Sequence, residues 1–314
     1  MIKKYYCILI LTFFIFPLFI SACSQTTSSV SGGSSYTIVQ VSSSDGDYDP
    51  TFSPDGNYMI YDQRLSDGNH ELWKVNLNNL SDKISLGKAA EEASWNPADS
   101  NKIAFIKMDN STGQWGGEAI YLMNASGESI TKIAPTGSAT PAWSMDGQYL
   151  LYELGRNIYK MKADGSVTVQ LTSREVDGDC SWPSFSYDGT KILFVKRSKS
   201  TDQGGNIWIM DTDGSNKKEL YAPSDGQCII FQQAWNKYDE IVFMKVFEAS
   251  VKKAPQVYLI KSDGSGLLTI TSDENTVSGD PVWDSEGKRI ALIRGPASNV
   301  EPPLQNVYYL IYRN

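Results

Sequence analysis

A repeat of 42 to 50 residues runs through most of this chain and constrains its fold more than any other feature. Each copy contains an aromatic residue, then a tight turn, then an apolar run, and the aromatic positions are Phe52, Trp95, Trp143, Phe185, Trp235 and Trp283. Their spacings are 43, 48, 42, 50 and 48 residues. A fixed period of this length is typical of architectures in which each copy is one supersecondary unit.

Each copy predicts four short strands. In the fourth copy, the turn at residues 186–189 separates two apolar segments, and a second aromatic-rich run at 207–210 follows, with an Asp-Gly turn at 213–214 after it. Short runs of Ile, Val, Tyr and Trp bounded by Asp-Gly are hairpin signals, because Gly accepts a positive φ at little cost. Four-stranded sheets at this period predict β-propeller blades.

Six copies over residues 36–314 predict an all-β fold, a six-bladed β-propeller of four-stranded antiparallel blades. The sixth copy ends after its third strand, and an unmatched strand at 36–42 precedes the first copy. We therefore predict that the N-terminal strand 36–42 completes the last blade and closes the ring. Closure removes an open sheet edge, which would otherwise pair with other chains.

The sequence around the aromatic residue resembles that of a known repeat family. Residues 50–56 read Pro-Thr-Phe-Ser-Pro-Asp-Gly and residues 141–147 read Pro-Ala-Trp-Ser-Met-Asp-Gly. They are similar to the TolB-like (WD40-like) β-propeller repeats, and the similarity covers nearly all of 36–314. Copies two and five depart from the pattern at 96–101 and 236–239, where the turn differs in length. The resemblance implies the propeller fold.

The N-terminal segment predicts export. Lys3 and Lys4 precede an apolar run over residues 7–20, which is the order of a signal peptide. The run ends in Ile20-Ser-Ala-Cys23, which resembles the lipobox of bacterial lipoproteins and implies cleavage after residue 22 and lipidation of Cys23. An ordinary secretory signal cut nearby, or a retained anchor, is the alternative. Residues 1–22 are then a lipoprotein signal peptide, 23–35 a flexible Ser/Thr/Gly tether and 36–314 the propeller.

Composition excludes several functions. The net charge is −8, so phosphate backbones repel the chain and we expect no nucleic-acid partner. The single histidine, His70, argues against histidine triads and histidine-rich metal sites, and its turn at 67–70 predicts a surface residue. We assign no metal and no cofactor, although the oxygen donors would allow Ca²⁺. Cys180 and Cys228 lie in loops that enter neighbouring blades and could form a disulfide after export, or stay separate thiols.

The start of the innermost strand of each blade supplies the candidate ligand-binding residues. Three residues before each repeat aromatic lie Asp49, Glu92, Thr140, Trp182, Gln232 and Asp280. Ring closure would place three acids side by side at the channel mouth, on the rim that also carries the long loops at 107–118, 196–205, 245–255 and 294–305. Focused negative potential attracts cations or basic peptides. The plainer interpretation is that polar residues only wet strand ends beside a water-filled channel.

Two functions remain open at this point. We favour a non-catalytic binding scaffold for an envelope protein, peptide or glycan, presented by a monomer that contacts the membrane through its lipid only. Its location would be the bacterial cell envelope, on the outer membrane facing the periplasm if the host has one. The alternative is a glycan-active enzyme, a glycosidase or lyase, that uses two carboxylates of the channel mouth. We assign no catalytic residue.

Overall fold

The computed structural model describes residues 25–29, 35–44, 46–108, 117–197, 205–223, 228–247, 253–297 and 305–312, with only the backbone for 25–29, 35 and 228–232. The predicted signal peptide, the predicted lipidation site Cys23 and the centres of the four long rim loops lie outside these residues. Within the described part of the chain, no helix is both long enough and apolar enough to cross a bilayer.

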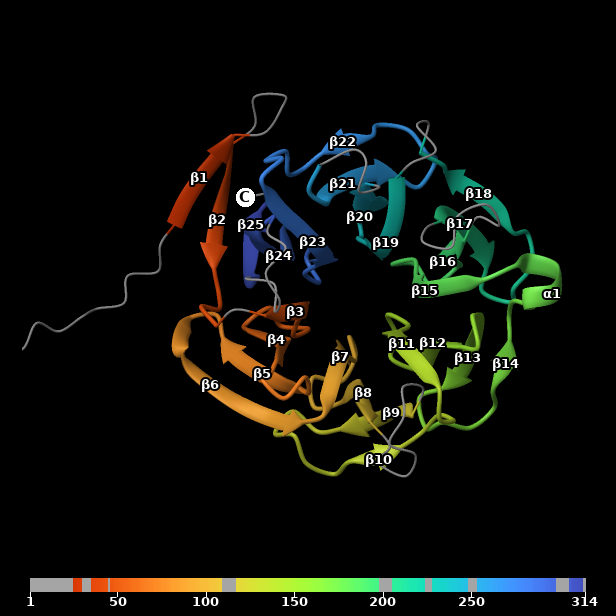
Figure 1. The fold of residues 1–314 in the computed structure, drawn as a ribbon. Helices are drawn as coiled ribbons and strands as arrows, with labels where there is room; N and C mark the ends of the chain where they lie inside the picture. The colour runs from red at the N-terminus through yellow and green to blue at the C-terminus, as the bar shows by residue number, and fades with distance from the viewer. Residues whose placement is uncertain are drawn as a thin grey trace, which may run out of the picture.

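Six antiparallel sheets stand around a central channel, and the chain visits them in order (Figure 1). Blade one consists of β3 (Asp47–Phe52), β4 (Tyr58–Arg64), β5 (His70–Asn76) and β6 (Asn79–Lys88). Blade two consists of β7 (Ala90–Trp95), β8 (Ile103–Met108), β9 (Glu118–Met123) and β10 (Thr131–Lys132). Blade three consists of β11 (Ser138–Trp143), β12 (Tyr149–Leu154), β13 (Asn157–Lys162) and β14 (Val169–Gln170).

The second half of the ring repeats this plan. Blade four follows the one-turn helix α1 (Arg174–Asp177) and consists of β15 (Cys180–Phe185), β16 (Lys191–Arg197), β17 (Gly205–Asp211) and β18 (Lys218–Tyr221). Blade five consists of β19 (Cys228–Trp235), β20 (Glu240–Phe247), β21 (Gln256–Lys261) and β22 (Leu268–Thr269). Blade six takes β23 (Thr276–Trp283), β24 (Arg289–Pro296) and β25 (Asn306–Ile311) from the C-terminal part of the chain. The predicted six-bladed propeller is confirmed.

The ring closes between the two ends of the propeller sequence. Strand β2 (Ser35–Gln40) pairs antiparallel with β25, with Ile38 opposite Leu310 and Gln40 opposite Tyr308. The apolar cluster between blades six and one also contains Val41. The N-terminal strand therefore completes blade six as predicted, and blades six, one and two are consecutive in the ring.

The segment expected to be a coil, 23–35, contains six strand residues, namely 25–29 and Ser35, the first residue of β2. Strand β1 (Gln25–Ser29) pairs antiparallel with β2 and adds a fifth strand to the outside of blade six. Its sequence, QTTSS, has no apolar alternation, so it offered no strand signal. The pairing follows from the backbone, because β2 would otherwise leave a row of donors and acceptors open at the sheet edge.

The core lies between the blades. Each of six apolar clusters takes its members from two neighbouring blades, and the one that joins blades six and one is built like the others. The second strand of a blade has both faces covered, so four consecutive residues of β8 and of β16 are buried. Burial on both faces is why these strands read as continuous apolar runs rather than as an alternating pattern.

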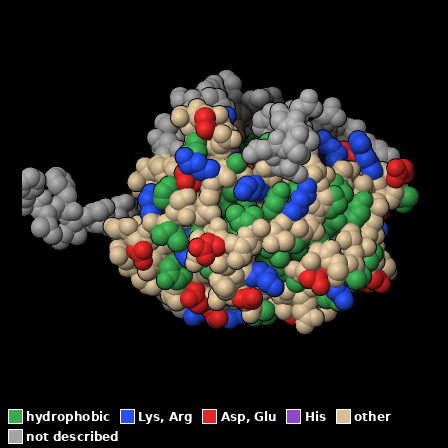
Figure 2. Space-filling model, turned by 90° about the horizontal axis from the view of Figure 1, so that it is seen from below, with side chains coloured by type: hydrophobic (Ala, Val, Ile, Leu, Met, Phe, Trp, Pro, Cys, Tyr) green, Lys and Arg blue, Asp and Glu red, His purple; other side chains and the backbone are tan. Residues whose placement is uncertain are grey.

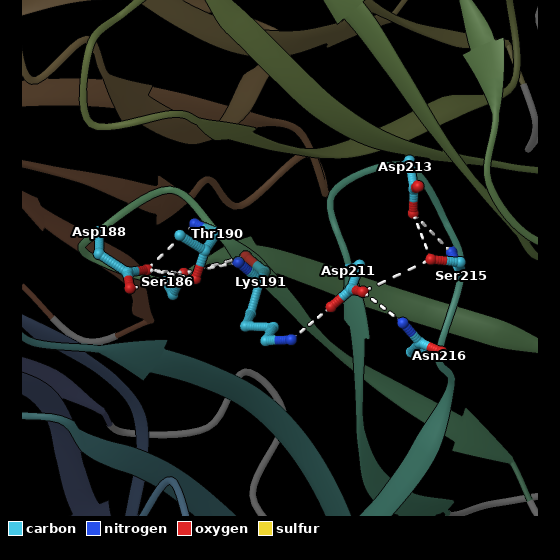
Figure 3. A network of polar contacts seen from close by, with 8 residues as sticks. All are labelled: Ser186, Asp188, Thr190, Lys191, Asp211, Asp213, Ser215 and Asn216. Carbon is cyan, nitrogen blue, oxygen red and sulfur yellow. Dashed lines mark hydrogen bonds and ion pairs between the residues drawn. The ribbon is translucent and has the colours of Figure 1, made fainter.

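The recurring Ser-x-Asp-Gly turn is a hydrogen-bonded unit, drawn for blade four in Figure 3. Ser186 Oγ donates to Asp188 Oδ1 at 2.7 Å and accepts from the backbone N–H of Lys191 at 2.9 Å. Asp188 Oδ1 also accepts from the backbone N–H of Thr190 at 3.0 Å. Gly189 has φ of +69°, which explains the glycine at this position. The turn motif thus fixes the hairpin between the first two strands of a blade.

Candidate functional site

One position in the innermost strand of five blades has a backbone conformation that is rare for residues with a Cβ atom. The φ values of Asp49, Glu92, Thr140, Trp182 and Asp280 are +45°, +48°, +53°, +47° and +49°. At each of them the pairing with the second strand shifts register, which marks a β-bulge. Such a φ costs about 1–2 kcal/mol. The bulge therefore presents the same position of each blade at the channel.

These positions meet around one mouth of the channel. A cavity of about 220 Å³ is lined by all five of them and by Gln233. The residues that follow each of these positions in the same strand, such as Pro50 and Thr51, line it as well. The sixth candidate, Gln232, falls at the equivalent register shift of blade five, but its side chain lies outside the described residues. We call the opening ringed by Asp49, Glu92, Thr140, Trp182 and Asp280 the acidic mouth.

Two of the carboxylates also connect neighbouring blades. Glu92 Oε2 accepts a hydrogen bond from the backbone N–H of Thr140 at 2.9 Å, and the Asp280 carboxylate accepts one from the backbone N–H of Asp49. In blade five, Gln233 Nε2 donates to the carbonyl of Trp182. The side chains at the mouth therefore also join neighbouring blades. This role supports the plainer interpretation, in which polar residues lie at strand ends without binding a ligand.

The acids of the mouth are half-buried and lie close to one another. Burial, followed by repulsion from Asp49, raises the pKa of Glu92 and of Asp280 well above the usual carboxyl range. The backbone hydrogen bonds described above lower each pKa only in part. A positive group placed in the mouth would favour the ionised carboxylates, because it relieves this repulsion. The mouth is suited electrostatically to a cation.

The opposite side of the mouth is different. The guanidinium of Arg197 lies 5.8 Å from the ring centroid of Trp182, a cation–π distance. Burial raises the pKa of Glu153 in blade three to about 7, although Arg197 and Arg156 act against the increase. Blades three and four thus balance acid with base, whereas blades six, one and two supply acids at the mouth.

A second group of polar side chains lies where blade one meets blade two. His70 Nδ1 is 2.8 Å from Asp62 Oδ2 and 3.6 Å from Glu91 Oε2. Asp62 is fully buried, whereas about a quarter of the His70 side chain is exposed. Burial, followed by repulsion from Asp49 and Glu91, raises the pKa of Asp62 well above its usual range. We call Asp62, His70 and Glu91 the Asp–His–Glu cluster.

Sequence reasoning missed this cluster. It treated His70 as a surface residue, but His70 is half-buried and opens β5, paired with Arg64 at the end of β4. In that register His70 and Asp62 are diagonal neighbours on one face of the hairpin. The five-residue loop between the strands was the only available signal, and Glu91 comes from another blade.

The other mouth of the channel is aromatic. A cavity of about 200 Å³ continues from the acidic mouth along the strands and is lined by the repeat aromatics Phe52, Trp95, Trp143, Phe185, Trp235 and Trp283. The indole N–H of Trp143 donates to the carbonyl of Ser94 in the preceding blade at 3.1 Å. The aromatic positions of the repeat therefore pack the lower channel and join blades.

Two larger grooves lie between turns on the aromatic side of the ring. They measure about 440 Å³ between blades four and five and about 630 Å³ between blades three and four. Their polar residues are engaged with one another, as Figure 3 shows for Asp211, which accepts from Asn216 Nδ2 at 2.6 Å and pairs with Lys191. These groups stabilise the turns, and we assign them no chemistry.

The side of the ring seen in Figure 2 has no charge bias of this kind. In the view of Figure 2, acidic and basic side chains are interspersed with apolar ones over the described surface. The acidic mouth, with three carboxylates on consecutive blades, differs from this side in charge as well as in shape.

Cys180 is a free thiol in the structure rather than half of a disulfide. It is fully buried in the apolar cluster between blades three and four, and burial raises its pKa to about 11. Cys228 belongs to blade five, on the other side of blade four, and its side chain lies outside the described residues. The thiol of Cys180 lies in the cluster shared with blade three, and the bridge to Cys228 that the sequence allowed stays a prediction.

The fold and its channel define the class of protein, a six-bladed propeller with four-stranded blades and Ser-x-Asp-Gly turns. Residues 30–239 match the family model of the TolB β-propeller domain. The chain belongs to this family, as the repeat motifs predicted. No curated protein matches the sequence.

Solved structures with the same fold are distant in sequence. A protein described as a TolB from Agrobacterium tumefaciens has a TM-score of 0.61 and 20% identity, with 86% of this chain and 91% of that chain covered. TolB from Acinetobacter baumannii has a TM-score of 0.57 and 14% identity, with 86% and 64% covered. An oligogalacturonate lyase in complex with manganese has a TM-score of 0.57 and 11% identity, with 93% and 97% covered. At these identities the similarity shows the fold alone.

Proposed function

We propose that this protein is a non-catalytic, lipid-anchored binding scaffold of the bacterial envelope, whose acidic mouth receives a positively charged segment of a protein or peptide partner. The observation that carries the proposal is the position of Asp280, Asp49 and Glu92 on three consecutive blades around one cavity. Their half-buried position reduces screening by water, so a lysine, an arginine or a chain-terminal amine gains from entering.

The size of the mouth supports binding of a side chain. Pockets for whole small molecules usually measure about 300–1,000 Å³. The acidic mouth, at about 220 Å³, is below this range, and the cavity of about 200 Å³ that continues from it is lined by the repeat aromatics rather than by the three acids. A single side chain or a chain end fits it better than a sugar chain and its catalytic acids, so we favour the scaffold over the glycan-active enzyme.

Export and anchoring are supported by the basic, apolar and Ile-Ser-Ala-Cys pattern of residues 3–23. Strand β1 begins two residues after Cys23. A lipid on Cys23 would therefore hold the outer edge of blade six close to the bilayer. We expect labelled palmitate to enter the wild-type protein in its host, and the variant Cys23→Ser to lack the label and appear in the soluble fraction. Equal labelling of both would refute the anchor.

The binding proposal is tested with a fluorescein-labelled, lysine-rich peptide and its acidic counterpart, followed by fluorescence anisotropy. The wild type should bind the basic peptide alone, and more weakly as salt increases. The variant Asp49→Asn/Glu92→Gln/Asp280→Asn should weaken binding by about tenfold or more, since loss of about 1.4 kcal/mol gives that factor. Asn and Gln keep the hydrogen-bond acceptor and the shape of the side chains that they replace, and Asn also adopts this backbone conformation.

A matched control separates position from net charge. The variant Asp82→Asn/Glu128→Gln/Glu286→Gln removes the same charge from exposed sites away from the mouth. It should bind the basic peptide nearly as well as the wild type does. Equal weakening in the two triple variants would mean that overall charge, and not the acidic mouth, attracts the peptide.

A further inference from the structure

The Asp–His–Glu cluster contains a buried hydrogen-bond acceptor that has no donor among the described residues. Asp62 Oδ1 is buried and has no hydrogen-bond partner among the described residues, while Oδ2 of the same carboxylate faces His70 Nδ1. A buried oxygen without a partner loses the free energy of its hydration. The cluster is therefore incomplete as a purely structural hydrogen-bond network.

Its donor atoms converge on one point. One atom each from Asp62, His70 and Glu91 lie within 4.8 Å of one another. Atoms bound to a single Zn²⁺ ion at about 2.0–2.2 Å in a tetrahedron are roughly 3.4 Å apart. The observed distances of 2.8 Å and 3.6 Å from His70 Nδ1 lie on either side of that value. Small shifts would bring all three donors onto one ion.

We propose that Asp62, His70 and Glu91 bind a divalent transition-metal ion of the Zn²⁺ class at the junction of blades one and two. Imidazole nitrogen favours zinc and its neighbours over Ca²⁺ and Mg²⁺, and two carboxylates supply charge. The ion would take the place of the hydrogen bond between Asp62 Oδ2 and His70 Nδ1, and its charge would stabilise the buried carboxylate whose Oδ1 has no partner among the described residues.

The surroundings suit such an ion. Tyr48 packs against His70 with ring centroids 6.0 Å apart, which limits rotation of the imidazole. The charges of Asp49 and Asp47 act on Asp62 and add negative potential. The ligands come from β4 and β5 of blade one and from β7 of blade two, so the ion would also cross-link two blades.

The single histidine of the chain makes the test direct, because any imidazole signal in an NMR spectrum is that of His70. We expect one equivalent of Zn²⁺, added to the purified full-length protein in detergent, to shift the His70 imidazole resonances, and the same amount of Mg²⁺ to leave them unmoved. Calorimetry should give one bound Zn²⁺ per chain. The variant Glu91→Gln should bind Zn²⁺ at least about tenfold more weakly, since even outer-sphere partners are worth 10- to 100-fold.

Glu128→Gln, in a turn on the aromatic side of blade two, is the matched control and should bind Zn²⁺ as the wild type does. An unmoved His70 signal at tenfold excess of Zn²⁺ would overturn the proposal, and so would wild-type affinity in Glu91→Gln. The wild-type spectrum decides the matter even if a variant fails to fold. The inference is independent of peptide binding, because failure of the acidic mouth to bind a peptide leaves the imidazole signal unaffected.

Discussion

The two halves of the acidic mouth have the same backbone and different side chains. Blades six, one and two place Asp280, Asp49 and Glu92 at the bulge, whereas blades three and four place Thr140 and Trp182 there with φ values within the same narrow range. The bulge therefore does not require a carboxylate. The charge of one half is an addition to the fold, and its burial opposes stability, as the raised pKa values of Glu92 and Asp280 indicate.

The largest expected effect comes from breaking the closure that makes the acidic half continuous. Val39 in β2 is paired with Tyr309 on one side and with Gln25 on the other. The variant Val39→Pro should lower the free energy of unfolding in urea by about 3 kcal/mol or more, because proline removes a ladder hydrogen bond. Thr27→Pro in the outermost strand β1 should lower the free energy of unfolding by less than Val39→Pro does. Equal losses would show that β2 does not close the ring.

In blades three and four, where acid and base are balanced, Glu153 should make the stability of the protein depend on pH. Burial raises its folded-state pKa from the usual 4.5 to about 7. Between these two pH values the folded protein thus holds a proton on Glu153 that the unfolded chain releases. The contribution of Glu153 to the free energy of unfolding is therefore complete below about pH 4.5 and is lost as the pH rises through 7. Glu153→Gln should flatten that part of the stability curve and raise the free energy of unfolding at pH 8 by on the order of 2 kcal/mol. An unchanged slope in thermal unfolding between pH 4.5 and 7 would contradict this.

In the acidic half, Asp280 should make stability depend on pH in the same direction. Burial, then repulsion from Asp49 and Asp62, raises its folded-state pKa well above the usual 3.8. Stability from this group is therefore present below about pH 4 and falls as the pH rises through the folded-state pKa. Asp280→Asn should be more stable than the wild type at pH 8, with the difference vanishing near pH 4. Lower stability at pH 8 would mean that the bond to Asp49 outweighs the repulsion.

The smallest effect is expected on the opposite rim. Ser186→Ala removes the hydroxyl that joins Asp188 to the backbone of Lys191. The loss should be about 1 kcal/mol in the free energy of unfolding, the typical value for one such hydrogen bond. Binding of a basic peptide should not change. A change in that binding would mean that the two rims of the channel do not act independently.

The sequence predicted the ring because its signals are local and repeated. A Ser-x-Asp-Gly turn such as 186–189 fixes its own hairpin, and the apolar run after it has only one way to bury both faces. Closure could also be predicted, since the strand at 36–42 matched the one that the sixth copy lacked. The positions of Asp49, Glu92 and Asp280 followed from the spacing of the repeat and from closure.

The remaining features depend on contacts between elements that no local pattern records. The Asp–His–Glu cluster requires the register of β4 with β5 and the approach of Glu91 from the next blade. Strand β1 forms because an edge is available, and not because its Ser/Thr sequence favours a strand. The orientation of Cys180 toward blade three was decided by side-chain packing, which cysteine spacing alone does not specify.

The central claim is that the carboxylates of the acidic mouth are present for binding and are not needed for folding. One comparison tests it most directly, the stability and the basic-peptide affinity of Asp49→Asn/Glu92→Gln/Asp280→Asn measured together at pH 7.5. We predict a free energy of unfolding equal to or above that of the wild type, with the affinity reduced by about tenfold or more. A less stable protein that still binds the peptide with wild-type affinity would contradict the claim.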